Sequence, residues 1–276
     1  RSGQLLSWLE ARNPNEAQVK EITRYLARHS GGPTFGILLL DLEADIFKLQ
    51  ATFDSVMNNY CRAFKIIVFT TGDLPAETTM QNTLHFVKVN ESNYVDKINQ
   101  MVSQSDCDWM VLAEAGDELT ASGLYQASLE LLAAPHCRAV AMDEFQRQAN
   151  GTLADVFRPG FNLDLLQTVP ALMARHWLIR RDVMVQVGGY SRDFKKALEF
   201  DLLLRPRFRL FNQMSDPTNI GGIEQHKSFC IEPITSCSAR FLIIGFDGSG
   251  QIKMHDKSNI GFIHPHAKGN GCHNQL

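Results

Sequence analysis

Short apolar runs alternate with amphipathic segments between residues 35 and 142, and this alternation limits the possible folds more than any other feature. The runs are FGILLL (35–40), FKIIVF (64–69), LHFVKV (84–89), WMVLA (109–113) and RAVAM (138–142). Each has the length of a buried strand, whereas the intervening segments repeat apolar residues at helical spacing. Strands that alternate with helices form a mostly parallel sheet with helices on both faces. We therefore predict an α/β fold.

Two of the expected strand ends lead into turns that carry acids. TTGD follows the second run at 70–73, and EAGD follows the fourth at 114–117. Ligands of parallel sheets bind beyond the carboxyl ends of the strands, where Glu114 and Asp117 could hold a divalent cation together with a diphosphate. Alternatively, these acids only cap the N-terminus of the following helix. The turn alone leaves both interpretations open.

Three later blocks also carry candidate residues: RPGFNLDLL (158–166), WLIRRDVMVQVGGY (177–190) and LEFDLLLR (198–205). A carboxylate at Glu199 or Asp201 could act as a general base toward an incoming hydroxyl. The same acids could instead be the solvated face of an amphipathic helix. Asn162 and its aromatic neighbours could shape a sugar-acceptor site or simply anchor a loop.

Composition excludes some classes of function. The net charge of −3 gives no reason to expect nucleic acid or an anionic membrane as partner. The sequence has no uninterrupted apolar run near the ~20 residues that span a bilayer. Six cysteines without a CxxC pair favour free thiols in a reducing compartment. A zinc site from Cys230, Cys237, Cys272 and His273 is conceivable, although paired-ligand spacing is absent.

Both ends of the chain carry further signals. The chain opens RSGQLLSW without an initiator Met, so we expect a fragment or a processed chain. Asn13 is expected to cap a helix with Pro14 at its first position and Glu16 at its third. Histidines gather near the other end, and we choose His264 as the one that would reach a metal; surface histidines in a polar tail are the alternative.

The order of these blocks resembles that of the family 2 glycosyltransferases with the GT-A (Rossmann-like) fold, from Phe35 to about Arg205. EAGDEL stands where the family has its acidic DxD-type motif, and RPGFNLDLL matches its RP-x-F-N-x-D-L-L loop. The VGGY segment and LEFDLLLR match the "G-G-[F/Y]" and "E-D-x-D-L-x-L-R" blocks. Each block alone is weak, but the shared order makes the resemblance fairly specific.

The resemblance implies a role for each matching position. It makes Glu199 the catalytic base and Asp201 the acid that follows it. It assigns donor binding to Asp41, Thr71, Asn99, Glu114 and Asp117, acceptor binding to Asn162 and Trp177, and a divalent cation (Mn²⁺ or Mg²⁺) to Glu114 and Asp117, with His264 as a third candidate ligand. Such enzymes use a nucleotide-sugar donor and invert the anomeric centre.

Four signature sites of the family are altered in this chain. LLDLEAD replaces the motif after the first strand and leaves Asp41 as a nucleotide contact, and TTGD replaces the Asp-rich turn after the second. The DxD motif becomes Glu-Ala-Gly, so that Asp117 would have to replace its middle carboxylate. The ED pair becomes Leu198-Glu199. These changes support an alternative, a catalytically degenerate GT-A-like module that serves a larger synthase as a binding or scaffolding domain.

The resemblance also implies a domain plan and a setting. We expect a helical preface or linker at 1–32, a GT-A domain at 33–240 and a C-terminal extension, partly disordered, at 241–276. The implied setting is bacterial surface polysaccharide synthesis in the cytoplasm, including the inner face of the membrane. The implied partners are a nucleotide-sugar donor, a glycan or lipid-linked acceptor and further domains of a larger polypeptide. A Rossmann-type dehydrogenase or nucleotidyltransferase is disfavoured, because no GxGxxG follows the first strand and no basic Gly-rich loop is present.

Overall fold

The computed structural model describes residues 13–75, 83–142, 144–147, 150, 152–156, 163–205, 243–246 and 252–253, and four isolated positions before residue 12. The predicted acceptor residue Asn162 and the predicted metal ligand His264 lie outside the described residues. So do Cys230, Cys237 and Cys272 of the conceivable zinc site. The roles of these residues therefore stay predictions.

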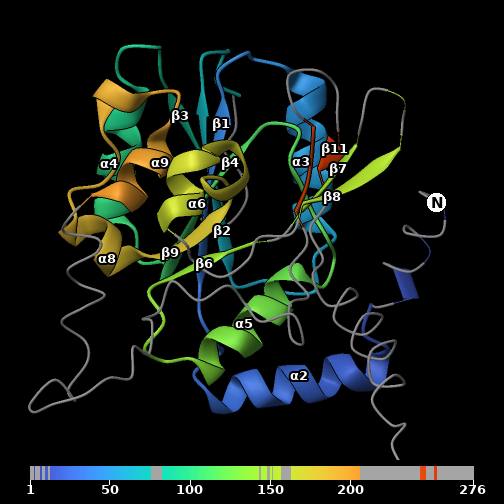
Figure 1. Cartoon of the computed structure of the whole chain (residues 1–276). Helices are drawn as coiled ribbons and strands as arrows, with labels where there is room; N and C mark the ends of the chain where they lie inside the picture. The colour runs from blue at the N-terminus through green and yellow to red at the C-terminus, as the bar shows by residue number, and fades with distance from the viewer. Residues whose placement is uncertain are drawn as a thin grey trace, which may run out of the picture.

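A six-stranded sheet forms the centre of the molecule (Figure 1), with the strand order β3-β2-β1-β4-β9-β6. The first four of these strands run parallel to their neighbours, whereas β9 is antiparallel to both β4 and β6. This confirms the predicted α/β architecture with a mostly parallel sheet. The strands are β1 (Phe35–Asp41), β2 (Phe64–Thr70), β3 (Leu84–Lys88), β4 (Trp109–Glu114), β6 (Ala139–Ala141) and β9 (Trp177–Arg180).

Helices cover both faces of this sheet, as Figure 1 shows. Side chains of β1 alternate between two apolar clusters, with Leu38 in one and Ile37 and Leu39 in the other. The face of Ile37 is covered by α3 (Ile46–Met57) and α5 (Gly123–Ala133). The face of Leu38 is covered by α4 (Tyr94–Gln104), α6 (Leu163–Thr168), α7 (Pro170–Met173), α8 (Arg181–Gln186) and α9 (Leu198–Leu204), and the short 3-10 helix η1 (Arg192–Phe194) precedes α9.

A second, smaller sheet lies beside the first, in the order β5-β10-β11-β7-β8. Its strands are β5 (Glu118–Leu119), β7 (Glu144–Arg147), β8 (Leu153–Val156), β10 (Ile243–Phe246) and β11 (Ile252–Lys253). β10 pairs with β5 at Ile243 and Leu119. This pairing joins part of the predicted C-terminal extension to the turn after EAGD.

The N-terminal helix α2 (Glu16–Arg28) begins later than the sequence suggested. The predicted cap at Asn13 is wrong: Asn15 is the N-cap, and its side chain and that of Gln18 each accept a hydrogen bond from the other residue's backbone N–H, at 2.9 and 3.0 Å. This reciprocal arrangement satisfies two free amides and so favours the later start. The helix packs on α5, with Leu26 buried and the hydroxyls of Thr23 and Tyr125 3.2 Å apart.

Within the described part of the chain, none of the helices combines the length and the apolar character that a membrane crossing requires.

Candidate functional site

A small cavity of about 200 Å³ opens at the carboxyl ends of β1 and β4. This is the edge of the sheet at which parallel α/β folds bind ligands. Its lining comes from the end of β1, the start of α3 and the end of β4: Leu40, Asp41, Leu42, Glu43, Asp45, Lys48, Glu114 and Ala115. The structure therefore brings two predicted donor-binding residues, Asp41 and Glu114, to one cavity.

Most polar groups in this cavity are bonded to their neighbours. Asp41 is buried, and its carboxylate accepts hydrogen bonds from the Thr70 hydroxyl at 2.7 Å and the Asp45 amide at 3.1 Å. The Nζ of Lys48 lies 2.8 Å from Glu43 Oε2, and this hydrogen bond raises the pKa of Lys48. Thr71 donates its hydroxyl proton to the Leu42 carbonyl and does not line the cavity.

The two acids of the EAGD turn point in different directions. Glu114 ends β4 with 59% of its side chain exposed, whereas Asp117 is 1% exposed. Oδ2 of Asp117 accepts a hydrogen bond from the Glu114 amide at 2.8 Å and lies 3.0 Å from Nε2 of His176. The helix-cap alternative for these acids is wrong, because β5 intervenes and Ser122 is the N-cap of α5.

Backbone geometry supports this tight turn. Gly116 has a φ of 103°, a value that L side chains rarely adopt, and its amide donates to the Thr52 hydroxyl at 2.8 Å. Thr52 is fully buried on α3, so the turn is fastened to the helix that also borders the cavity.

His176 lies between two buried carboxylates. Its Nε2 contacts Asp117 and its Nδ1 contacts Oε2 of Glu144, the first residue of β7. Burial alone would lower the pKa of His176, but the charges of Glu144 and Asp117 outweigh it and raise that pKa to about 9. With a carboxylate on each ring nitrogen, the protonated imidazole donates to both. The φ of His176 is 55°, an uncommon backbone conformation for a residue with a side chain.

Glu199 extends the same network from α9. Its Oε2 accepts a hydrogen bond from the backbone N–H of His176, and its Oε1 accepts one from that of Trp177, both at 3.0 Å. The residue is only 7% exposed. The Trp177 ring is buried in the core, where its Nε1 donates to the Met173 carbonyl. The predicted catalytic base therefore lies at the carboxyl edge of the sheet, whereas the ring of the predicted acceptor residue Trp177 points into the core.

Arg175 is the positive side chain at the surface of this network. Its side chain is 32% exposed, and its Nη2 lies 3.8 Å from Oε2 of Glu114. Burial would lower the pKa of Arg175, but the carboxylates of Glu114, Asp117, Glu144 and Glu199 hold it above its ordinary value. Arg175 is therefore permanently charged beside the exposed acid of EAGD.

Asn99 and Asp201 occupy a different place, around the VGGY turn. The Asn99 amide exchanges two hydrogen bonds of 2.8 Å with the backbone of Tyr190. Asp201 pairs with Arg205, whose guanidinium also donates to the carbonyls of Val187 and Gly189. Neither Asn99 nor Asp201 lines the edge cavity, and both hold the turn against α4 and α9.

Two of the predicted metal ligands, Glu114 and Asp117, differ in their surroundings. Among the described residues, no three His, Cys, Asp or Glu side chains are grouped so that they could hold a metal ion. Of the two predicted carboxylate ligands, Glu114 faces solvent, but Asp117 is buried against His176 and the Glu114 amide. The Glu114–Asp117 pair therefore does not fit a shared divalent cation in this arrangement.

Sequence reasoning did not select Arg175, His176 or Glu144. Arg175 and His176 precede β9, and because β9 is antiparallel to β4, its start lies at the carboxyl end of β4. The run HWLI at 176–179 was the available signal, but only its antiparallel placement beside β4 would have brought these residues to the site.

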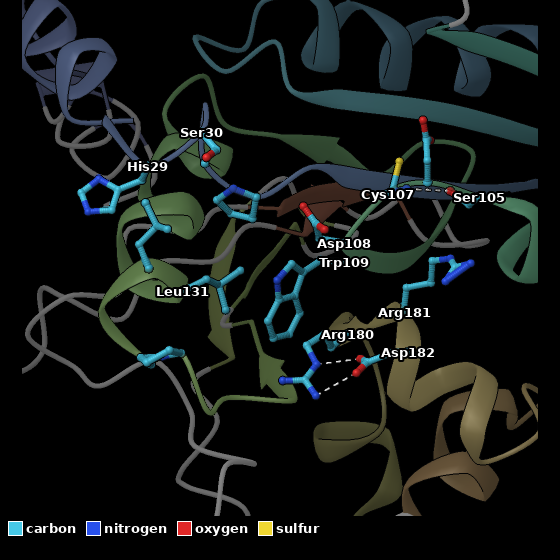
Figure 2. Close-up of a pocket in the computed structure, with 16 residues that line it drawn as sticks. His29, Ser30, Ser105, Cys107, Asp108, Trp109, Leu131, Arg180, Arg181 and Asp182 are labelled. Atoms are coloured by element: carbon cyan, nitrogen blue, oxygen red, sulfur yellow. Dashed lines mark hydrogen bonds and ion pairs between the residues drawn. The ribbon is translucent and has the colours of Figure 1, made fainter. Parts of the chain in front are cut away.

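A larger cavity of about 690 Å³ lies at the opposite, amino edge of the sheet, between α5 and the β9–α8 junction (Figure 2). Arg180 and Asp182 pair there through two hydrogen bonds of 2.6 and 2.9 Å. The carboxylate of Asp108 accepts hydrogen bonds from the backbone N–H and the hydroxyl of Thr34. Although this cavity is larger, we consider the carboxyl edge the candidate site, because the buried charge network lies there and ligands of such sheets bind there.

Comparison with known proteins gives a local relative and distant structural neighbours. No family model matches the chain. The O-antigen biosynthesis protein RfbC of Myxococcus xanthus is 35% identical over 100 residues, which are 36% of this chain and only 8% of that protein. A structure of S. aureus TarS in complex with UDP is 12% identical with a TM-score of 0.45, over 61% of this chain and 53% of that chain.

A second structural neighbour is the mannosyltransferase PcManGT from Pyrobaculum calidifontis, in complex with GDP-Man and Mn²⁺. It is 12% identical with a TM-score of 0.43, over 66% of this chain and 53% of that chain. The chain thus spans about half the length of these two structures. At such identities and TM-scores the neighbours do not establish a family for this chain.

The charged His176 bridge predicts a dependence of stability on pH. Its pKa is about 9 in the folded chain and about 6.5 when unfolded, so its contribution is complete below pH 6.5 and is lost as the pH rises to 9. We expect a loss on the order of 3 kcal/mol over that window. The free energy of unfolding, measured in urea from pH 6 to 10, checks this.

A His176→Gln variant should lose most of this pH dependence, because Gln does not titrate. His85→Gln, at an exposed position on β3, is the matched control and should retain the wild-type profile. Parallel profiles for the wild type and His176→Gln between pH 6.5 and 9 would contradict the charged bridge.

Asn99→Ala should destabilise the chain by about 1–3 kcal/mol, because the backbone N–H and C=O of Tyr190 lose their partners. Chemical denaturation measures this change, with the exposed neighbour Gln100→Ala as control. If Asn99 instead contacted a donor, as the sequence suggested, the variant would lose nucleotide affinity while keeping its stability.

Proposed function

We propose that this chain is a glycosyltransferase module that moves a sugar from a nucleotide-sugar donor to a hydroxyl of a glycan or glycoconjugate acceptor, in bacterial surface polysaccharide synthesis. The observation that carries the proposal is the meeting, at one edge of the sheet, of a polar cavity, the buried carboxylate of Glu199 and the partly exposed Arg175. The local identity with an O-antigen biosynthesis protein supports the polysaccharide setting.

The edge cavity suits the hydroxyl-bearing part of a donor. Carboxylates accept hydrogen bonds from ribose or sugar hydroxyls, and Glu43 and Glu114 present exposed carboxylates there. The cavity of about 200 Å³ is smaller than pockets that enclose a whole drug-sized ligand, about 300–1,000 Å³. We therefore assign it to one portion of the donor, with the rest lying along the edge toward Arg175.

Glu199 is the proposed catalytic base. Its two carboxylate oxygens accept backbone amides, and a carboxylate at this position can take up the proton of an acceptor hydroxyl. In the proposed step the acceptor hydroxyl loses its proton to Glu199 as its oxygen attacks the anomeric carbon. The bond from that carbon to the diphosphate oxygen breaks, and the electron pair leaves with the nucleoside diphosphate. Attack from the opposite side inverts the anomeric centre.

A divalent cation, when bound, would neutralise the diphosphate. Only Glu114 of the two predicted ligands is available to hold it, since Asp117 binds His176. For this reason the proposed transfer step gives no role to a cation.

A non-catalytic binding or scaffolding module of a larger synthase is the second candidate. It is favoured by the burial of Glu199 and Asp117, whose carboxylates already serve the fold. The two candidates differ in what the loss of the Glu199 charge should do.

Glu199→Gln should lower sugar transfer about a hundredfold or more if Glu199 is the base. Donor hydrolysis and transfer are measured with a panel of UDP-, GDP- and dTDP-sugars, with and without Mn²⁺ or Mg²⁺. Nucleotide binding by calorimetry and a thermal melt separate loss of chemistry from loss of structure, because Gln leaves one of the two backbone amides poorly paired.

Glu21→Gln, on the exposed face of α2, is the control and should transfer sugar as the wild type does. An unchanged cellular product with Glu199→Gln would favour the scaffolding module. Failure of the wild type to bind any nucleotide would rule out the glycosyltransferase proposal.

A further inference from the structure

The EAGD turn has a buried partner within the chain. His176 contacts Asp117 on one side and Glu144 on the other, and all three residues are at most 3% exposed. The acid that the sequence assigns to a metal ion is thus held by a side chain and a backbone amide of the same protein. If a donor diphosphate binds at this edge, its charge needs a different partner.

Arg175 meets the requirements of that partner. Its guanidinium carries five N–H donors in a planar fork that matches phosphate oxygens. It makes no hydrogen bond to the described residues, and its contact with Glu114, at 3.8 Å, is too long to be one. About a third of the side chain is exposed, so a ligand at the edge can reach it.

A second cation, Lys48, lines the cavity itself. Lys48 holds Glu43 through a hydrogen bond of 2.8 Å. Arg175 also adjoins the EAGD turn directly, because it precedes the strand that is antiparallel to β4. Arg175 has no hydrogen bond to a described residue, whereas one of the three N–H donors of Lys48 is used.

The surrounding acids do not prevent this role. Asp117 and Glu144 share the charge of His176, and Glu199 accepts two backbone amides. Glu114 remains, and it is exposed enough for water to screen its repulsion of a phosphate. Among the described residues, the acid that contacts Arg175 is therefore the exposed one.

We propose that Arg175 binds the diphosphate of the donor and holds its charge as the sugar–phosphate bond breaks, in place of a divalent cation at Glu114 and Asp117. The inference rests on the proposed function and deepens it. It makes nucleoside diphosphate binding independent of added metal, and it makes Asp117 and His176 positioning residues that fix the turn beside Arg175.

The test is calorimetric binding of UDP, GDP, CDP and dTDP, and of the matching nucleosides, in EDTA and in Mn²⁺. The wild type should bind one diphosphate in EDTA, within about threefold of its affinity in Mn²⁺. Arg175→Gln should weaken the binding of that diphosphate about tenfold to a hundredfold, because a charged hydrogen bond is lost. The affinity for the nucleoside should not change. Arg175→Lys should recover part of the loss.

Arg62→Gln is the matched control, since Arg62 lies in the loop before β2 at the opposite edge and donates to the Met57 carbonyl. It should bind as the wild type does. A thermal melt of each variant checks its folding. A general loss of structure would weaken the binding of diphosphate and nucleoside alike, so a loss of diphosphate affinity alone indicates a lost contact.

Two results would overturn the proposal, and they differ from each other. Binding that EDTA abolishes and that Arg175→Gln leaves unchanged would assign the diphosphate to a metal and keep the proposed function. Absence of binding of every nucleotide by the wild type, in EDTA and in Mn²⁺, would refute the proposed function and this inference with it.

Discussion

The contact of His176 with two buried carboxylates is the interaction on which the candidate site depends. It joins three segments that are distant in sequence: the turn after β4, the first residue of β7 and the lead-in to β9. The backbone of the same residue donates to Glu199 and so fixes α9 as well. An unpaired buried charge is costly, so the removal of any one partner would disturb all four segments.

The antiparallel strand β9 explains why this network forms at the carboxyl edge. A parallel strand beside β4 would start at the amino edge and would carry residues 175 and 176 away from EAGD. Because β9 runs the other way, its first residues adjoin the last residues of β4, and its last residues lie near the amino-edge cavity. One strand direction therefore places Arg175 at one edge and Arg180 at the other.

The central sheet could be predicted from the sequence, but the site only in part. Runs such as FGILLL are long and apolar enough to indicate β1, whereas β5, β7 and β8 have two to four residues and no clear alternation. Glu114 and Glu199 could be named as candidates because they lie within recognisable blocks. The partner of Asp117 could not be predicted, because His176 is 59 residues away in sequence and only the strand order brings it near.

One altered block of the chain, EAGD, takes part in this network through Asp117. A metal site needs carboxylates whose lone pairs are free, and a protonated histidine between Asp117 and Glu144 removes that freedom. Gly116 brings no further carboxylate to this turn, and its φ of 103° suits a residue without a side chain. Arg175, beside the same turn, has no hydrogen-bonded acid among the described residues. Two sequence neighbours therefore meet the turn in different ways, because His176 fixes Asp117 whereas Arg175 keeps its donors free.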